Sequence, residues 1–282
     1  MNIIVGDKSG FCAGVSYTIK KADELLNKYK NIYCLGEIVH NERVVKSLED
    51  KGMITVSKLE EIPNGSKVIF RAHGEAKKVY EEAEKKNLEV FDLTCGKVRL
   101  IHNKIEKRED FVIIVGKAIH PETIGHVGYI KYGCVIENID DVDKAYKIFQ
   151  DSGKNEIYIV AQTTFNEEKF EKIVDVIKEK FANIKIEVDK TICSATRERQ
   201  EEVVDLAKKN DLMIIVGGKN SSNTKELYNL AIDNCKKALL ICDVNDLKEE
   251  IINENNVGIM AGASTPDVVV EEIIEYLKRK DR

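Results

Sequence analysis

The chain has 282 residues, 43% of them hydrophobic and 33% charged, with a net charge of −5 and only three prolines. This composition is typical of a globular protein and argues against long disordered linkers. No apolar run approaches the roughly 20 residues that span a bilayer, the N-terminus lacks the pattern of a signal peptide, and no dense basic stripe is present. We therefore expect a cytoplasmic protein that binds neither membrane nor nucleic acid.

Short β-branched runs alternate with helical patterns along the chain. In chain order, the strand-like runs are NIIVG, NIYCLG, KVIF, FVIIVG, EIYIVA, LMIIVG and VGIM. The clearest helical periodicities cover residues 15–26, 98–105 and 203–207. This alternation predicts an α/β fold with mainly parallel sheets.

The seven cysteines fall into two groups. An odd number without an export signal argues against a disulfide framework. Four lie in apolar strand-like or helical runs and are expected to pack as small hydrophobic side chains: Cys34, Cys134, Cys235 and Cys242. The other three are flanked by small or turn-forming residues, in GFCAG, LTCGK and TICSA: Cys12, Cys95 and Cys193. We expect this second group to have a chemical role.

Each cysteine of the second group starts a repeated pattern. A helix and a strand follow it and lead to a glycine 21 to 24 residues later: Gly36, Gly116 and Gly217. Four positions after that glycine stands a polar residue: His40, His120 and Ser221. A second strand then leads to another polar residue: His73, Thr163 and Ser264. We therefore expect three similar units.

The third unit lacks a cysteine after Ser264, and the N-terminal strand with Cys12 can complete it. The pattern predicts three α/β units in a closed, pseudo-threefold trefoil. Their predicted boundaries are 14–96, 97–193 and 194–282, the last completed by residues 1–13. In such a fold three thiols and six polar strand ends would converge on one centre.

The polar strand ends indicate an anion site. Ligands of parallel α/β units bind beyond the carboxyl ends of strands, where helix N-termini present unpaired N–H groups. Two histidines and a Ser/Asn cluster with few basic residues would suit a diphosphate. For each serine or asparagine alone, simple helix capping remains the alternative. The stretch GGKNSSNT does not match a phosphate-binding P-loop.

Three cysteines without a fourth favour an iron–sulfur cluster with one open iron over structural zinc, which normally takes four ligands. A cysteine nucleophile with a histidine base is an alternative, but it would account for only one of the three. Glu122 lies two residues after His120, where a shielded carboxyl can deliver a proton. Alone, it would be a first-turn helix acid. His102 and His126 lie outside the repeat and are expected to be ordinary surface or helix-packing residues.

The ordered motifs resemble those of the 4-hydroxy-3-methylbut-2-enyl diphosphate reductase family, over nearly the full chain. They are GFCAGV, EIVHN, RAHG, TCGKV, HPE, QTT, ICSAT, GGKNSSNT and AGASTPD. The resemblance implies a trefoil around a [4Fe-4S] cluster on Cys12, Cys95 and Cys193. The implied reaction, the last step of the non-mevalonate isoprenoid pathway, reductively removes an allylic hydroxyl and yields isopentenyl and dimethylallyl diphosphates. Reduced ferredoxin or flavodoxin would supply the electrons.

The resemblance also implies roles for individual residues. The substrate diphosphate would be bound by His40, His73, His120, Ser221, Ser222, Asn223 and Ser264. Glu122 would be the proton source, assisted by Thr163 and His120. Two positions depart from the family pattern: Gly96 stands where proline is common, and Lys117 where histidine is frequent. A non-catalytic iron–sulfur sensor or electron carrier is the alternative, but such a protein needs neither an anion pocket nor a proton donor.

Overall fold

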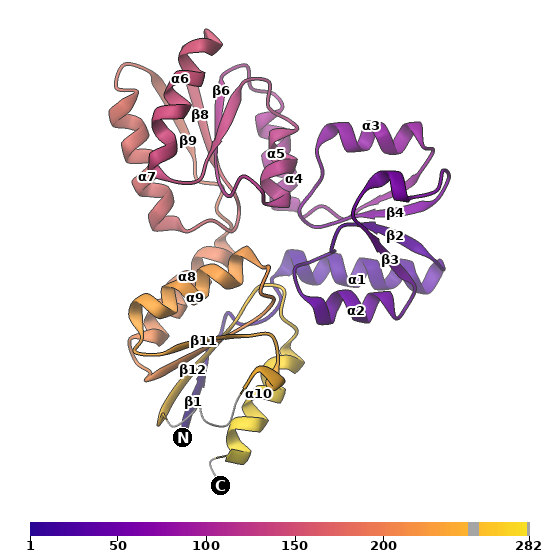
Figure 1. Ribbon diagram of the computed structural model, residues 1–282, viewed down its shortest axis with the longest axis vertical. Helices are drawn as coiled ribbons and strands as arrows, with labels where there is room; N and C mark the ends of the chain where they lie inside the picture. The colour runs from indigo at the N-terminus through magenta and orange to yellow at the C-terminus, as the bar shows by residue number, and fades with distance from the viewer. Residues whose placement is uncertain (248–253, 281–282) are drawn as a thin grey trace. The chain divides into compact units, whose positions relative to one another are not determined.

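Three sheets, each of four parallel strands, carry the fold in the residues that the computed structural model describes, 1–247 and 254–280 (Figure 1). Strands and helices alternate throughout this part of the chain, which confirms the predicted α/β class. None of the described helices is long and apolar enough to cross a membrane.

The first sheet in chain order has the strand order β3-β2-β4-β5. Its strands are β2 (Ile32–Leu35), β3 (Met53–Val56), β4 (Lys67–Phe70) and β5 (Glu89–Asp92). The elements around them in the chain are α1 (Ala13–Lys28), α2 (Glu42–Glu49), the 3₁₀ turn η1 (Leu59–Glu61) and α3 (Lys77–Lys85). Apolar side chains of β2 and β4 pack with Ala83 of α3 and Leu59 of η1.

The second sheet has the order β7-β6-β8-β9. Its strands are β6 (Phe111–Val115), β7 (Gly133–Ile136), β8 (Glu156–Ala161) and β9 (Lys185–Asp189). The accompanying helices are α4 (Gly96–Ile105), α5 (Pro121–Val127), η2 (Ile139–Asp141), α6 (Val142–Ser152) and α7 (Glu167–Lys180). Alternate residues of β6 pack against α6 and α7 on one face and against α4 on the other (Figure 1). Burial on both faces explains why the central strands are continuous apolar runs.

The third sheet joins the two ends of the described chain in the order β1-β12-β10-β11. Its strands are β1 (Asn2–Val5), β10 (Leu212–Val216), β11 (Ala238–Ile241) and β12 (Asn256–Ala261). The accompanying helices are α8 (Ser194–Ala207), α9 (Ser222–Asn234), η3 (Val244–Asp246) and α10 (Asp267–Lys280). β1 pairs with β12 from Asn2 opposite Asn256 to Val5 opposite Ile259. The first residues of the chain therefore form an edge of its last sheet.

By its internal contacts the chain forms two compact units. The first unit comprises Met1–Ile19, Val39–Asp50 and Ser194–Arg282, and the second comprises Lys20–Ile38 and Lys51–Cys193. The first compact unit holds the third sheet together with α2, and the second compact unit holds the first and second sheets. These two compact units, called the first and the second unit below, are not the three α/β units predicted from the sequence. The boundaries of the three predicted α/β units stay a prediction.

The strand registers correct one position of the predicted repeat. In every sheet the two central strands end opposite each other, at Leu35–Phe70, Val115–Ala161 and Val216–Ala261. The following turn is closed by equivalent backbone bonds, in which Gly74 donates to Arg71, Phe165 to Gln162 and Thr265 to Gly262. Thr164 is thus the equivalent of His73 and Ser264, and the assignment of Thr163 to that position was wrong by one residue. Two adjacent threonines cannot be told apart by pattern alone.

Candidate functional site

The three cysteines of the repeat occupy equivalent places, directly before α1, α4 and α8. Their backbone N–H groups donate to turn carbonyls: Cys12 to Ala263 (3.2 Å), Cys95 to Ala72 (3.0 Å) and Cys193 to Thr163 (3.0 Å). All three side chains are partly exposed, and all seven cysteines are free thiols. The absence of disulfides agrees with the sequence prediction.

In the first unit, three loops that carry predicted site residues meet. The Ser264 hydroxyl donates to the backbone carbonyl of His40 at 3.4 Å. A Cβ on Gly218 would lie 2.2 Å from the same carbonyl oxygen, so only glycine permits this approach. Since Gly218 lies three residues before Ser221, the unit brings His40, Ser221 and Ser264 into one neighbourhood.

The loop before α9 is tied down by a helix cap. Ser221 is the N-cap of α9, and its hydroxyl accepts from the Thr224 N–H at 3.2 Å. Asn41, next to His40, caps α2 in the same way by accepting from Val44 at 3.2 Å. Capping, the alternative raised for these residue types, therefore describes the Ser221 side chain in this structure. It also fixes the first turn of α9, where Ser222 and Asn223 are buried.

Asn223 is the most informative residue of the first unit. Its side chain is 4% exposed, yet neither its amide nitrogen nor its amide oxygen has a hydrogen-bond partner among the described residues. The neighbouring Thr224 hydroxyl is also unpaired within the same part of the chain. Leaving a buried polar group unsatisfied costs roughly 1–3 kcal/mol. A polar ligand at the N-terminus of α9 would remove that cost, which fits the anion site predicted here.

In the second unit, Glu122 lies at the centre of a buried network. His120 is the N-cap of α5, and its Nδ1 accepts from the Glu122 N–H at 3.2 Å. The Glu122 side chain is 2% exposed. One carboxylate oxygen, Oε1, accepts from the Thr163 N–H at 2.6 Å, and Oε2 accepts from the Thr163 hydroxyl at 2.7 Å. The predicted proton source and its predicted assistant are therefore in direct contact.

The surroundings of Glu122 keep it ionised. Burial raises the pKa of this carboxyl, but the hydrogen bond and the charge of His126 oppose it, with help from His120 and the Thr163 N–H. The net result is a pKa below the usual glutamate value. In this state Glu122 is a carboxylate at neutral pH, so it must take up a proton before it can deliver one.

One further predicted residue, His73, completes this group. The rings of His73 and His120 stand edge to face, with centroids 5.6 Å apart. His73 follows Ala72, the backbone acceptor of the Cys95 N–H, and Thr163 accepts the N–H of Cys193. The second unit therefore gathers His73, His120, Glu122 and Thr163 at strand ends linked to two of the three cysteines.

His102 and His126 were expected to be ordinary surface or helix-packing residues, and the surface alternative is wrong. They are 3% and 0% exposed, and their ring centroids lie 5.0 Å apart. Nε2 of His126 lies 3.3 Å from Oε1 of Glu122, one helical turn away on α5. The four-residue spacing on a predicted helix was the signal that could have linked this pair.

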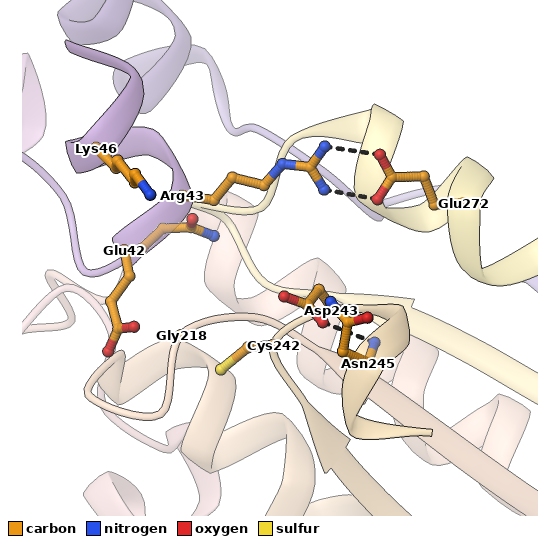
Figure 2. A pocket seen from close by; sticks show the side chains of 9 residues that line it. Glu42, Arg43, Lys46, Gly218, Cys242, Asp243, Asn245 and Glu272 are labelled. Carbon is orange, nitrogen blue, oxygen red and sulfur yellow. Dashed lines mark hydrogen bonds and ion pairs between the residues drawn. The ribbon is translucent and has the colours of Figure 1, made fainter. Parts of the chain in front are cut away.

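The four cysteines expected to pack as hydrophobic side chains differ in burial. Cys34 is fully buried in β2, whereas the other three are partly exposed. Cys242 lines a pocket of about 490 Å³ in the first unit (Figure 2). Charged groups dominate the pocket, including Arg43, whose two guanidinium nitrogens each lie 2.6 Å from an oxygen of Glu272. None of the predicted site residues lines it.

Comparison with known proteins gives a consistent result. A family model described as LytB protein matches residues 3–278. A protein from Caldanaerobacter subterraneus subsp. tengcongensis, named 4-hydroxy-3-methylbut-2-enyl diphosphate reductase, is 40% identical over 286 residues, with 99% of this chain and 97% of the relative covered. The solved structure of the E-1-hydroxy-2-methyl-but-2-enyl-4-diphosphate reductase from Plasmodium falciparum matches with a TM-score of 0.90 at 32% identity, covering 98% of this chain and 88% of that one. A second structure, described as (E)-4-hydroxy-3-methyl-but-2-enyl diphosphate reductase, the terminal enzyme of the non-mevalonate pathway, matches with a TM-score of 0.69 at 36% identity, covering 99% and 100%.

Proposed function

Because the chain belongs to the LytB protein family, we propose that it is a 4-hydroxy-3-methylbut-2-enyl diphosphate reductase. In this reaction two electrons and two protons remove the allylic hydroxyl as water, and the products are isopentenyl and dimethylallyl diphosphates. The likeness to named reductases over the full chain supports the activity. The structural observation that carries the proposal is Glu122, a buried carboxyl that accepts two hydrogen bonds from Thr163. The backbone carbonyl of Thr163 in turn accepts the N–H of Cys193.

We propose that Cys12, Cys95 and Cys193 hold a [4Fe-4S] cluster. Three free, partly exposed thiols, each directly before a helix, fit the thiolate ligands that such clusters require. When bound, the cluster supplies the electrons and a Lewis-acidic iron.

Most of the residues that bind the substrate diphosphate in this proposal lie in the first unit, and His73 and His120 lie in the second. The Asn223 amide and the Thr224 hydroxyl, both in the first turn of α9, provide donors that the described residues leave unused. Ser222 follows β10 and Ser264 follows β12, and the Ser264 hydroxyl donates to the backbone carbonyl of His40. The remaining residues proposed for the diphosphate are Ser221, His73 and His120.

Glu122 delivers the proton. Thr163 fixes the carboxyl through its N–H and hydroxyl, and His120 fixes the backbone at Glu122 through its Nδ1. Because the carboxyl is shielded from water, the proton it takes up passes to the substrate and not to bulk solvent. An anionic substrate nearby would raise the pKa of Glu122 and promote the uptake of that proton.

Reduced ferredoxin or flavodoxin is proposed as the electron donor, and the cytoplasm as the compartment. Seven free thiols are consistent with a reducing environment. The proposal includes no nucleic-acid partner.

The direct test is anaerobic incubation with (E)-4-hydroxy-3-methylbut-2-enyl diphosphate and a strong artificial electron donor, with iron and sulfide counted in the same sample. We expect both isoprenoid diphosphates to form. Protein that carries a full, reducible cluster but leaves the substrate unchanged would instead be the non-catalytic carrier.

A further inference from the structure

The His126–Glu122 pair goes beyond the residues assigned so far. His126 lies one turn after Glu122 on α5, is fully buried, and places Nε2 3.3 Å from Oε1. Its second nitrogen, Nδ1, has no hydrogen-bond partner in the described part of the chain. The carboxylate of Glu122 is therefore the group to which the buried imidazole of His126 is hydrogen-bonded in the described residues. We infer that any role of this polar ring acts through Glu122.

The bonds around Glu122 define what His126 can do. A carboxylate only accepts hydrogen bonds, so Nε2 carries a proton whenever Glu122 is ionised. Oε1 then accepts from both His126 and the Thr163 N–H, and Oε2 accepts from the Thr163 hydroxyl. The backbone N–H cannot release its proton. The proton on Nε2 is therefore the transferable one that faces Oε1.

We propose that His126 is a positioning and proton-holding residue, which returns a proton to Glu122 after Glu122 has delivered its own. This inference rests on the proposed function, whose reaction consumes two protons while one carboxyl holds one. In the step, the Nε2–H bond of the His126 imidazolium breaks and an O–H bond forms on Oε1 of Glu122. The imidazole is left neutral with its remaining proton on Nδ1, and no electrons are transferred.

The groups around the pair are compatible with a proton on His126. The titratable and charged groups that face or act on the pair and its neighbour His102 are Glu122 and His120 from α5 and its cap, His102 and Arg99 from α4, Asp92 from β5, and Tyr129. Burial and the charge of His126 lower the pKa of His102 to about 4, so His102 stays neutral near pH 7 and does not compete for positive charge. Glu122 is the acid in direct contact with His126.

The first test measures protonation directly, without turnover. Infrared difference spectra of the cluster-loaded enzyme are recorded against pH for the wild type, Glu122→Gln and His126→Gln. The carboxylic C=O band that Glu122→Gln removes belongs to Glu122. In His126→Gln, which keeps an N–H donor but loses the titrating group, we expect this band to appear at a higher pH than in the wild type. A band at an unchanged pH would overturn the proposal.

The second test measures catalysis. In His126→Gln we expect kcat to fall about 10²-fold, the lower end of the range for a lost proton-transfer group, while KM stays within about twofold. A purely structural His126 would be replaced adequately by glutamine, and a wild-type kcat with a wild-type pH profile would contradict a role in proton transfer. His126→Leu removes the hydrogen bond as well and should lower both kcat and the melting temperature.

A third measurement covers the case in which the variants do not fold. Nitrogen-15 spectra of histidine-labelled wild-type enzyme should show one slowly exchanging imidazolium that titrates together with the Glu122 infrared band. A buried ring that stays neutral over the whole working pH range would overturn the proposal. If the wild type does not reduce the substrate, the proposed function fails, while the infrared and nitrogen-15 measurements still decide whether the pair shares a proton.

Discussion

The two compact units differ in how far the polar side chains of their predicted site residues are hydrogen-bonded. In the first unit, Asn223 is buried with no partner for its amide among the described residues, and no carboxylate is among the predicted residues there. In the second unit, Thr163 donates to both carboxylate oxygens of Glu122, and Nε2 of His126 lies within hydrogen-bond distance of one of them. A buried side chain with unused donors gains hydrogen bonds when a ligand binds, whereas a carboxyl that already accepts several hydrogen bonds is held in one position. In the proposed mechanism, Asn223 of the first unit therefore contributes to substrate affinity and Glu122 of the second unit to proton transfer.

The backbone does not create this difference. Each sheet ends its two central strands opposite each other and follows the second with the same hydrogen-bonded turn. The contrast comes from side chains placed on equivalent turns and helix starts. The comparison between the units can therefore be tested by single substitutions.

The largest effect is expected at the three cysteines that are proposed to hold the cluster. Cys193→Ser should lose the bound iron and all reductase activity, because serine is a poor cluster ligand. Iron and sulfide counts with the activity assay measure this. Cys242→Ser is the matched control, since Cys242 is also a partly exposed free thiol, and it should keep both iron and activity. Retention of a full cluster by Cys193→Ser would refute the three-cysteine proposal.

Glu122→Gln should lower kcat at least ~10²-fold, the typical scale for a lost general acid, and leave substrate affinity nearly unchanged. Steady-state kinetics and calorimetric binding separate the two quantities. Glu168→Gln is the control, because Glu168 lies in the first turn of α7 as Glu122 does in α5 but is exposed. Normal turnover by Glu122→Gln would return Glu122 to the role of a first-turn helix acid.

Asn223→Ala should weaken substrate binding by about 10-fold or more, because a hydrogen bond to a charged group is worth about 1.5–3 kcal/mol. The free protein should lose no stability, since the amide has no partner to lose in the described structure. Asn166→Ala is the control, and it should lose stability and keep substrate affinity. Asn166 caps α7 by accepting from the Lys169 N–H at 2.7 Å, so its removal should cost about 1 kcal/mol of stability and leave affinity unchanged. Unchanged affinity in Asn223→Ala would remove this residue from the anion site.

A smaller effect is expected for pH. Burial holds the pKa of His102 at about 4, below its ordinary value of 6.5. Below pH 6.5 the His102 side chain therefore binds a proton in the unfolded chain but stays neutral in the folded chain. The free energy of unfolding consequently falls as the pH drops from 6.5 towards 4. His102→Phe should flatten the decrease in the urea midpoint between pH 7 and pH 5. An unchanged slope would show that other groups cause the acid sensitivity.

The smallest effect is expected at the Arg43–Glu272 pair, which joins α2 to α10 within the first unit (Figure 2). Both side chains are more than a third exposed. Exposed ion pairs typically contribute less than about 1 kcal/mol, so Glu272→Gln should shift the urea midpoint only slightly, and less at high salt. A large loss of affinity in this variant would show that the pair positions the His40 loop.

Much of the fold could be predicted from the sequence because its signals are local. Fully buried parallel strands require continuous apolar runs, and those runs identified the central strands of every sheet. Cys12, Cys95 and Cys193 stood out because glycine and other small residues flank them at strand ends.

The details of the site could not be predicted, because they depend on contacts between distant segments. The choice between Thr163 and Thr164 follows from strand register, and the contact of Glu122 with Thr163 joins residues 41 positions apart. That the Asn223 amide is unpaired becomes visible only when its surroundings are known. His126 was assigned an ordinary role because it lies outside the repeat, although its spacing from Glu122 was already present in the sequence.

The most direct test of the separate roles of Asn223 in substrate binding and Glu122 in proton transfer combines two measurements. Calorimetric binding and single-turnover rates are measured in Glu122→Gln and Asn223→Ala. Glu122→Gln should bind (E)-4-hydroxy-3-methylbut-2-enyl diphosphate with wild-type affinity and convert it at least ~10²-fold more slowly. Asn223→Ala should bind it at least ~10-fold more weakly and convert it at close to the wild-type rate once saturated. If both variants lose the same quantity, whether affinity or rate, the assignment of binding to Asn223 and proton transfer to Glu122 is contradicted.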